Sequence, residues 1–246
     1  PETKALYIET PSNPMMEITD LSACAELAKE HNLLMITDNT FLSPYLQNPI
    51  ALGADIVIHS ASKFLCGHND TIAGFVCSAR EELAAKIRLI AKTTGGCLSP
   101  FDSWLVMRGI KTLAVRMERQ QENAGNIARW LTEQKKVRKV YYAGLETHPG
   151  YEINAKQARG AGAMISFDVD SVETAQRVLE KVRVITFAES LGGTESLITY
   201  PMKQTHPDVP KEWREKLGIT DTLLRLSVGL EHVDELIADL EQAFVS

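Results

Sequence analysis

Short apolar runs alternate with segments of helical periodicity through the first hundred or so residues of the chain. The runs lie at residues 5–9, 33–37, 56–58 and 72–77, and the helical segments lie at about 20–31 and 81–92. Asp20 or Thr19 is placed to cap the first of these helices. Strands that are apolar throughout are typical of buried parallel sheets. This order therefore predicts an α/β domain with a mostly parallel sheet and helices on both faces.

The second half of the chain is predicted to form a smaller α+β domain. A long helical segment, roughly Ser103 to Gln134 with an interruption near Gly109, leads into it. Strands follow near 137–141, 163–169, 184–187 and 222–227, with helices near 172–182 and 233–244. We therefore expect two domains, residues 1–112 and 113–246, joined through the long helix. Its charged side chains are interpreted as a solvated face; they are Arg108, Lys111, Arg116, Glu118, Arg119 and Glu122.

Composition argues against several classes of partner. The chain has 246 residues, a formal net charge of −6 and no long basic run, which gives no support to binding of nucleic acid or anionic membranes. Its longest apolar stretches are strand-length, which predicts no transmembrane helix. The four cysteines form no C-x-x-C pair, which favours free thiols in a reducing cytosol. Because the chain begins almost directly on a strand, we expect Pro1 to lie in the middle of a domain.

The segment Asp55–Lys63 runs from an apolar strand into a turn that carries two serines and one lysine. Ser60 and Ser62 can hydrogen-bond an anion, and Lys63 can form a Schiff base with a carbonyl. Pyridoxal phosphate (PLP), which has both an aldehyde and a phosphate, would use both kinds of group. The alternative is an ordinary strand-to-loop turn with a surface lysine.

Polar side chains also follow other strands. Asp38 ends the apolar run Leu33–Ile36, where an unpaired buried carboxylate is costly. It is interpreted as the partner of a protonated pyridine nitrogen or as a turn or capping aspartate, and Lys63 one strand later favours the first. Asn13 follows the first strand. Because ligands of open α/β sheets bind outside the carboxyl ends of the strands, these side chains predict one crevice.

Potential metal-ligating side chains flank the same turn. They are His59, Cys66, His68 and Asp70, and their spacing matches no compact zinc pattern. No G-x-x-x-x-G-K-[ST] motif occurs, which argues against a phosphate-binding nucleotide loop. We therefore expect no metal site and no nucleotide site of that type.

A series of longer motifs extends over nearly the whole chain. They are Glu9-Thr-Pro-Ser-Asn-Pro14, Asp38-Asn-Thr-Phe41, Pro44-Tyr-Leu-Gln47, Leu52-Gly-Ala-Asp-Ile-Val57, His59-Ser-Ala-Ser-Lys-Phe64, Gly67-His-Asn-Asp70, Met107-Arg-Gly-Ile-Lys-Thr-Leu113, Glu189-Ser-Leu-Gly-Gly193 and Leu224-Arg-Leu-Ser-Val-Gly229. In this order they closely resemble the Cys/Met-metabolism family of PLP-dependent enzymes. The resemblance implies the fold of type I PLP-dependent transferases.

The resemblance also implies roles for individual residues around the cofactor. Lys63 would form the Schiff base with PLP and carry protons during the reaction. Asp38 would hold the pyridine nitrogen, and Ser60 and Ser62 would bind the phosphate. Asn13 would lie near the phenolic oxygen of the cofactor and near the substrate carboxylate.

Two further residues are assigned to the substrate by the same resemblance. Arg225 would clamp the α-carboxylate, a role suited to its bidentate guanidinium. An arginine between apolar Leu224 and Leu226 also needs a partner if its strand is covered. Ser190 would help to position that carboxylate and Lys63.

The chain departs from the family pattern in three places. Ser62 stands where threonine is usual, and Cys66 stands where a glycine is expected. The family's N-terminal segment, with its phosphate loop, stacking tyrosine and Tyr-x-Arg motif, is missing, so we expect a C-terminal part of a family member. The family also implies a homotetramer whose active sites are shared between subunits.

The resemblance implies an activity in trans-sulfuration, within methionine and cysteine metabolism. The prediction is a carbon–sulfur lyase acting on cystathionine or a related sulfur amino acid by α,β- or α,γ-elimination. Residues from Gly193-Thr-Glu-Ser-Leu-Ile-Thr-Tyr-Pro201 through Thr205-His206 favour a lyase. The alternatives are γ-replacement, as in cystathionine γ-synthase or O-acylhomoserine sulfhydrylase, and methionine γ-lyase. An inactive fragment or assembly domain is the non-enzymatic alternative.

Overall fold

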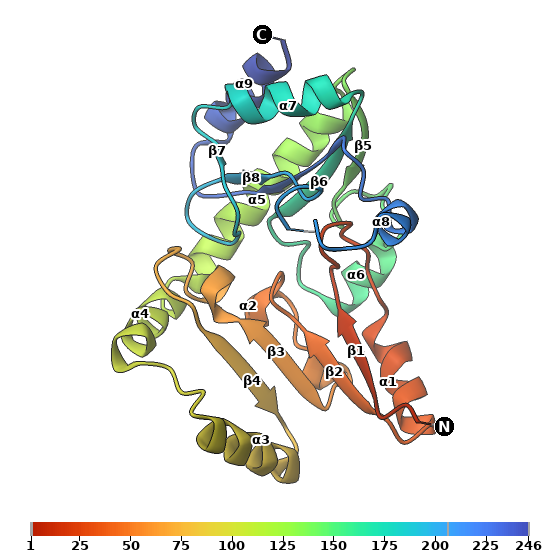
Figure 1. Cartoon of the computed structure of the whole chain (residues 1–246), viewed down its shortest axis with the longest axis vertical. Coiled ribbons are helices and arrows are strands. Elements are labelled where there is room, and N and C mark those ends of the chain that lie inside the picture. Colours follow the sequence, from red (N-terminus) through yellow and green to blue (C-terminus); the bar gives the residue numbers. More distant parts are fainter. Residues whose placement is uncertain (1, 206, 246) are drawn as a thin grey trace.

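The computed structural model describes residues 2–205 and 207–245, and within these the strands form two sheets (Figure 1). The first sheet has the strand order β1-β2-β3-β4. Its strands are β1 (Ala5–Glu9), β2 (Leu34–Asp38), β3 (Ile56–Ser60) and β4 (Gly74–Ser78). The first three are parallel and β4 pairs antiparallel with β3. This agrees with the mostly parallel sheet predicted from the apolar runs.

The register of this sheet brings polar residues from different strands to one edge. Glu9 pairs with Asp38, and Asp38 pairs with Ile58 two residues before the end of β3 at Ser60. Parallel strands all direct their carboxyl ends to the same edge of a sheet. The polar side chains predicted to follow the strands therefore lie at the carboxyl edge of the first sheet.

Four helical segments accompany the first sheet. They are α1 (Leu21–Glu30), α2 (Ser43–Leu46), the 3₁₀ turn Pro49–Leu52 and α3 (Glu81–Thr94). Of the two predicted capping residues, Asp20 is the one that caps α1, since its carboxylate accepts the backbone N–H of Ala23 at 3.0 Å. Leu21 of α1 packs with Met35 and Val57 in a small core under the sheet. The helix is thereby fixed by both its cap and its apolar face.

The predicted long helix is two helices in the structure. They are α4 (Pro100–Ile110), capped by the Ser99 side chain, and α5 (Leu113–Thr132). The break falls at Lys111 and Thr112, just after Gly109. A Cβ atom on Gly109 would lie 2.1 Å from the carbonyl oxygen of Cys66, so only glycine lets α4 pack this closely on the segment after Lys63. Helix α5 then runs from the first sheet to the second (Figure 1).

The second sheet has the strand order β5-β6-β9-β8-β7. Its strands are β5 (Val137–Tyr141), β6 (Met164–Val169), β7 (Thr186–Phe187), β8 (Leu197–Thr199) and β9 (Leu223–Ser227). All pairs are antiparallel except β7 with β8. The sequence analysis missed β8 and made β7 two residues too long at its start. The remaining helices are α6 (Tyr151–Gln157), α7 (Val172–Lys181), α8 (Lys211–Leu217) and α9 (Val233–Val245).

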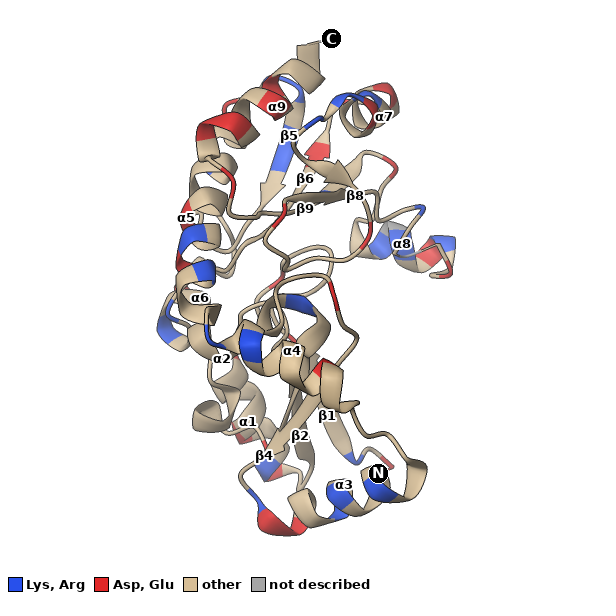
Figure 2. Ribbon diagram, turned by 90° about the vertical axis from the view of Figure 1, so that its left-hand side faces the viewer, with Lys and Arg blue, Asp and Glu red and all other residues tan. Residues whose placement is uncertain are grey.

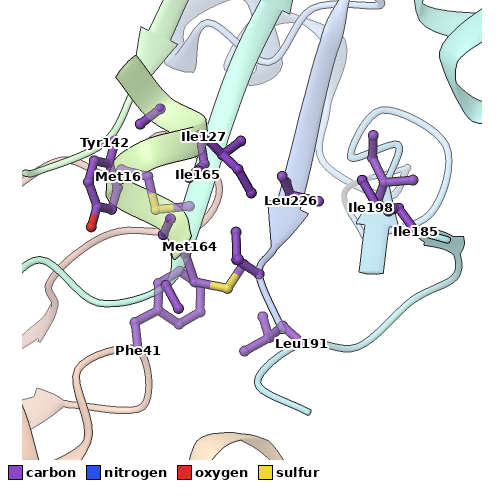
Figure 3. Close-up of a cluster of buried hydrophobic side chains, with 14 of the residues drawn as sticks. Met16, Phe41, Ile127, Tyr142, Met164, Ile165, Ile185, Leu191, Ile198 and Leu226 are labelled. Carbon is purple, nitrogen blue, oxygen red and sulfur yellow. The ribbon is translucent and has the colours of Figure 1, made fainter. Parts of the chain in front are cut away.

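One continuous apolar cluster joins the second sheet to the segments that follow β2 and β3 of the first sheet. Ile127 of α5, Ile165 of β6 and Leu226 of β9 lie at its centre (Figure 3). Phe41, from the loop that follows β2, belongs to the same cluster. Shared burial of this kind fixes the second sheet relative to the carboxyl edge of the first.

Arg116 contradicts the interpretation of the long helix as a solvated face. Its side chain is buried, with the residue only 3% exposed, and it binds backbone carbonyls instead of solvent. The other five charged residues of that set, Arg108, Lys111, Glu118, Arg119 and Glu122, are exposed as predicted. Residues of both signs of charge occur along the α5 ribbon (Figure 2). The prediction was wrong at Arg116 because charge alone does not report which face of a helix is packed.

No helix within residues 2–205 and 207–245 combines the length and the apolar character needed to cross a bilayer.

Replacing Asp239 is expected to loosen α9 from the segment that precedes β7. Its carboxylate accepts the backbone N–H groups of Arg183, Val184 and Ile185 at 2.8–2.9 Å. Asp239→Ala leaves these donors without an acceptor, so we expect a loss of about 3 kcal/mol in the free energy of unfolding. Urea denaturation measures it. Glu241→Ala, an exposed change on the same helix, is the control; an equal effect of both variants would contradict this role.

Candidate active site

Lys63 lies in a short π-helical turn that follows β3 directly. The turn covers Ala61–Leu65, and Lys63 itself has non-helical dihedral angles, φ −94° and ψ −132°. The backbone N–H of Cys66 bonds the carbonyl of Ala61, and that of Gly67 bonds the carbonyl of Lys63. Single π turns are frequent at functional sites because they re-aim one side chain out of a regular element.

The Lys63 amine contacts a residue 127 positions later in the chain. Its Nζ donates to the Oγ of Ser190 at 3.1 Å. Burial lowers the pKa of Lys63, the charge of Arg225 lowers it further, and Glu189 partly offsets both. A lowered pKa enlarges the fraction of neutral amine, which is the nucleophilic and proton-accepting form.

Arg225 is a buried cation whose bonded partners are all neutral. In the middle of β9 it is 2% exposed. One terminal nitrogen donates to Asn13 Oδ1 at 2.9 Å, and the other donates to the Ser190 carbonyl at 3.2 Å and to Thr199 Oγ1 at 3.3 Å. Its Nε is buried and has no partner among the residues that the structure describes.

The electrostatics of Arg225 favour binding of an anion. Burial lowers its pKa to about 10, and Glu189 and Glu9 offset part of the effect. A buried charge without a charged partner is costly, and bonds to neutral oxygens compensate it only in part. A carboxylate from a ligand would supply the missing counter-charge in bidentate geometry.

The loop that carries Ser190 lies directly on the Lys63 turn. Ser190 has φ +82°, and Gly192 follows with φ +77°. A Cβ atom on Gly192 would lie 2.6 Å from the backbone nitrogen of Phe64. The glycine is required here by both the left-handed backbone and the close approach, and it lets Ser190 reach Lys63.

Asp38 lies at the carboxyl end of β2 beside a second carboxylate. Its Oδ1 accepts the backbone N–H of Thr40 at 2.9 Å, and Thr40 Oγ1 accepts the N–H of Ser60 at 2.8 Å. Glu9 is its register partner on β1. Desolvation and the negative charge of Asp38 raise the pKa of Glu9 to about 7. Glu9 is therefore only partly ionised near neutral pH, and the neighbouring Asp38 carboxylate offers the negative charge that would stabilise a cationic group.

The two serines predicted to bind a phosphate have different surroundings. Ser62 Oγ accepts the N–H of Ala73 at 2.9 Å and is 3.3 Å from the Ala73 carbonyl, to which it donates. At Ser60 the backbone N–H is bonded, and the hydroxyl has no hydrogen-bond partner within the described residues. Ser60 is thus freer to meet an anion than Ser62, and both roles stay predictions.

Among the predicted residues, the structure brings Lys63, Ser190, Arg225 and Asn13 into one chain of hydrogen bonds. Asp38 and Ser60 form a second group at the carboxyl edge through Thr40. Direct bonds between the two groups are not found in residues 2–205 and 207–245.

Sequence analysis overlooked residues that support this arrangement. Thr199 is 1% exposed and accepts from Arg225, but its short strand carries little periodic signal. Glu189 acts on the pKa values of Lys63 and Arg225, and Glu9 acts on that of Arg225. Both glutamates stand inside motifs that were noted for other residues. Their position beside Asn13 and Ser190 was the available signal.

Comparison with known proteins confirms the resemblance seen in the motifs. A family model described as Cys/Met metabolism PLP-dependent enzyme matches residues 1–245. A cystathionine beta-lyase of Lactococcus lactis subsp. cremoris (strain MG1363) is 51% identical over 98% of this chain and 64% of its own. A cystathionine gamma-lyase of Bacillus subtilis (strain 168) is 50% identical over 99% of this chain and 64% of its own.

A solved structure confirms the predicted α/β fold. The crystal structure of cystathionine gamma synthase from Xanthomonas oryzae pv. oryzae, in complex with aminoacrylate and cysteine, matches with a TM-score of 0.97. It is 44% identical, and the match covers 98% of this chain and 63% of that one. The chain thus spans about 64% of the length of the curated relatives it matches.

The lowered pKa of Lys63 predicts a specific pH dependence of stability. Between the lowered pKa and the ordinary value of 10.5, the unfolded chain binds more protons at this site than the folded chain. Stability contributed by Lys63 therefore rises with pH in this window. Comparing wild type with Lys63→Met by urea denaturation should show the difference shifting in favour of wild type as the pH rises.

Lys86→Met, an exposed replacement on α3, measures the effect of losing a lysine as such. A wild-type-minus-Lys63→Met difference that is flat with pH, or that shifts in the opposite direction, would contradict the lowered pKa.

Proposed function

Because the chain belongs to the family of Cys/Met metabolism PLP-dependent enzymes, we propose that the protein is a carbon–sulfur lyase acting on cystathionine or a related sulfur amino acid. The observation that carries this proposal is Arg225. Its guanidinium is buried, bonds only neutral groups, and is linked through Ser190 to the Lys63 amine. The carboxylate of an amino-acid substrate would bind the Arg225 guanidinium, and its amino group would react beside the Lys63 amine.

The side chains of the site fit the cofactor of the family. Lys63 provides an amine of lowered pKa for the aldehyde. Asp38 provides a carboxylate at the strand edge for a protonated pyridine nitrogen. Ser60 provides a hydroxyl for the phosphate, with Ser62 beside it in the same turn. Asn13 bonds Arg225, which supports its assignment to the substrate side of the cofactor.

Proton movement is assigned to Lys63. PLP, when bound, supplies a carbonyl that condenses with amines and a ring that takes up the negative charge left at the substrate Cα. The Lys63 Nζ accepts the Cα proton, and its lowered pKa enlarges the fraction of the amine that is in the accepting form. Ser190 Oγ, at 3.1 Å, orients the amine. Arg225 holds the carboxylate, so the Cα–H bond is presented to Lys63 in a fixed direction.

The same residues serve two eliminations. Breaking the Cβ–S bond converts cystathionine and water into homocysteine, pyruvate and ammonia. Removing a further proton from Cβ and breaking the Cγ–S bond instead converts cystathionine and water into cysteine, 2-oxobutyrate and ammonia. Since both begin with proton transfer to Lys63, the geometry supports both. We favour elimination over γ-replacement because of the sequence from Gly193 through His206. Within that sequence, His206 lies outside the residues that the structure describes.

We also propose a homotetramer with shared active sites, a cytoplasmic location and a division into domains at residues 1–112 and 113–246. Exposed Phe101, Trp104 and Met107 on α4 support contacts between subunits. Cys24, Cys66, Cys77 and Cys97 are free thiols, which supports a reducing compartment.

Incubation of the PLP-loaded protein with cystathionine tests the proposed reaction. Homocysteine with pyruvate identifies β-elimination, and cysteine with 2-oxobutyrate identifies γ-elimination. Arg225→Lys keeps the charge but loses the bidentate contact, so we expect kcat/KM to fall roughly 10- to 100-fold. Arg119→Lys, on the exposed face of α5, is the matched control. Turnover only with an acylated homoserine and a thiol would overturn the lyase assignment.

A further inference from the structure

Helix α5 buries a row of three polar side chains in its otherwise apolar inner face. Arg116, Gln120 and Asn123 stand at positions i, i+4 and i+7, so they share one side of the helix. They are 3%, 0% and 0% exposed. Met117 and Ala124, in the same row, are apolar and equally buried. We refer to Arg116, Gln120 and Asn123 as the polar stripe of α5.

Arg116 binds the backbone that follows Lys63. Its terminal nitrogens donate to the carbonyls of Phe64 at 2.8 Å, Leu65 at 3.3 Å and Gly109 at 2.9 Å. A Cβ atom on Gly67, which has φ +75°, would lie 2.0 Å from the guanidinium. The turn and the guanidinium are therefore packed with no room for another side chain. Two of these carbonyls, those of Phe64 and Leu65, belong to the end of the π turn, so Arg116 holds the turn from which Lys63 projects.

Gln120 binds the two segments that carry the partners of Lys63. Its Nε2 donates to the carbonyl of Gly193 at 2.6 Å and to that of Val228 at 3.1 Å. Gly193 is three residues after Ser190, and Val228 is three residues after Arg225. One amide group thus ties the Ser190 loop to the end of β9.

Asn123 continues the row one turn further. Its Nδ2 donates to the carbonyls of Gly229 at 3.1 Å and Glu231 at 2.9 Å. The stripe as a whole therefore bonds backbone from four separate segments, at residues 64–65, 109, 193 and 228–231. Three of these four segments carry or follow a residue of the candidate site. No two of these segments are neighbours in the sequence.

Stability alone does not account for this choice of side chains. The Gln120 Oε1 and Asn123 Oδ1 atoms are buried and have no partner in the described part of the chain. Arg116 is desolvated enough to lower its pKa, and its bonded partners are neutral oxygens. Unpaired buried polar atoms cost about 1–3 kcal/mol each, and apolar side chains of similar volume avoid that cost.

We propose that Arg116 and Gln120 are positioning residues, which hold the Lys63 turn and the Ser190 loop in register so that the Lys63 amine meets Ser190 Oγ and Arg225. The inference rests on the proposed function, in which Lys63 is the reacting amine. Both residues lie on one helix, so a single element sets the geometry between segments that lie 52 to 108 positions away from it in the sequence. Preorganisation of this kind keeps reacting groups within tenths of an ångström.

The pH midpoint of Lys63 acylation tests the proposal without the cofactor. Acetic anhydride labels neutral amines, and peptide mass spectrometry quantifies each lysine against exposed Lys29 and Lys92. In wild type the neighbouring charges are Arg225 and Glu189, and burial with Arg225 lowers the pKa of Lys63. In Arg116→Lys and Gln120→Met, loss of register should move the Lys63 midpoint up, toward those of Lys29 and Lys92.

Two design features separate positioning from a general loss of stability. Ile127→Val removes one methylene from the apolar part of the same helix, and it should lower the melting temperature without moving the Lys63 midpoint. Gln120→Met keeps the volume and also removes the unpaired oxygen, so it folds even if Arg116→Lys does not. An unchanged midpoint in a folded Gln120→Met protein would overturn the proposal.

The visible spectrum after addition of PLP distinguishes failure of the positioning role from failure of the proposed function. Absence of a new absorbance band in wild type would contradict the function assigned to Lys63. A wild-type band that Gln120→Met reproduces in intensity and pH dependence would overturn positioning alone. A band that weakens in Gln120→Met but not in Ile127→Val supports it.

Discussion

The uncompensated charge of Arg225 is the constraint on which the rest of the site depends. A guanidinium at 2% exposure needs acceptors on every side, and three come from different parts of the chain. Asn13 follows β1, Ser190 precedes β8, and Thr199 ends β8. Because these bonds go to neutral oxygens, they locate the cation without neutralising it. The fold thereby leaves a buried positive charge that an anionic group of a ligand would neutralise.

The register of the second sheet determines where this charge lies. Arg225 of β9 pairs with Ser166 on β6 and with Thr199 on β8. Ser166 Oγ in turn donates to the Pro14 carbonyl at 2.6 Å, which secures the loop that carries Asn13. A shift of β9 by one residue would exchange Arg225 with its apolar neighbours and direct it to the opposite face. Strand pairing and site geometry are thus one constraint.

Local signals in the sequence predicted the elements and much of the site, whereas tertiary burial decided the rest. Asp20 was identified as a cap because capping is a local interaction. Strand β8 was missed because three residues carry too little periodicity, and Arg116 was misread because charged residues are usually exposed. Its place in line with Leu113, Met117 and Gln120 on one helix face was the signal that could have corrected this.

The central claim is that Lys63, made more reactive by burial and by Arg225, is the residue that binds PLP. Incubation with PLP, reduction with borohydride and peptide mapping measures this directly, because reduction makes the attachment permanent. The account predicts that the modification is found on Lys63, near one per chain, while exposed lysines such as Lys29 and Lys92 stay largely unmodified. Modification spread evenly over exposed lysines, with Lys63 unlabelled, would contradict it.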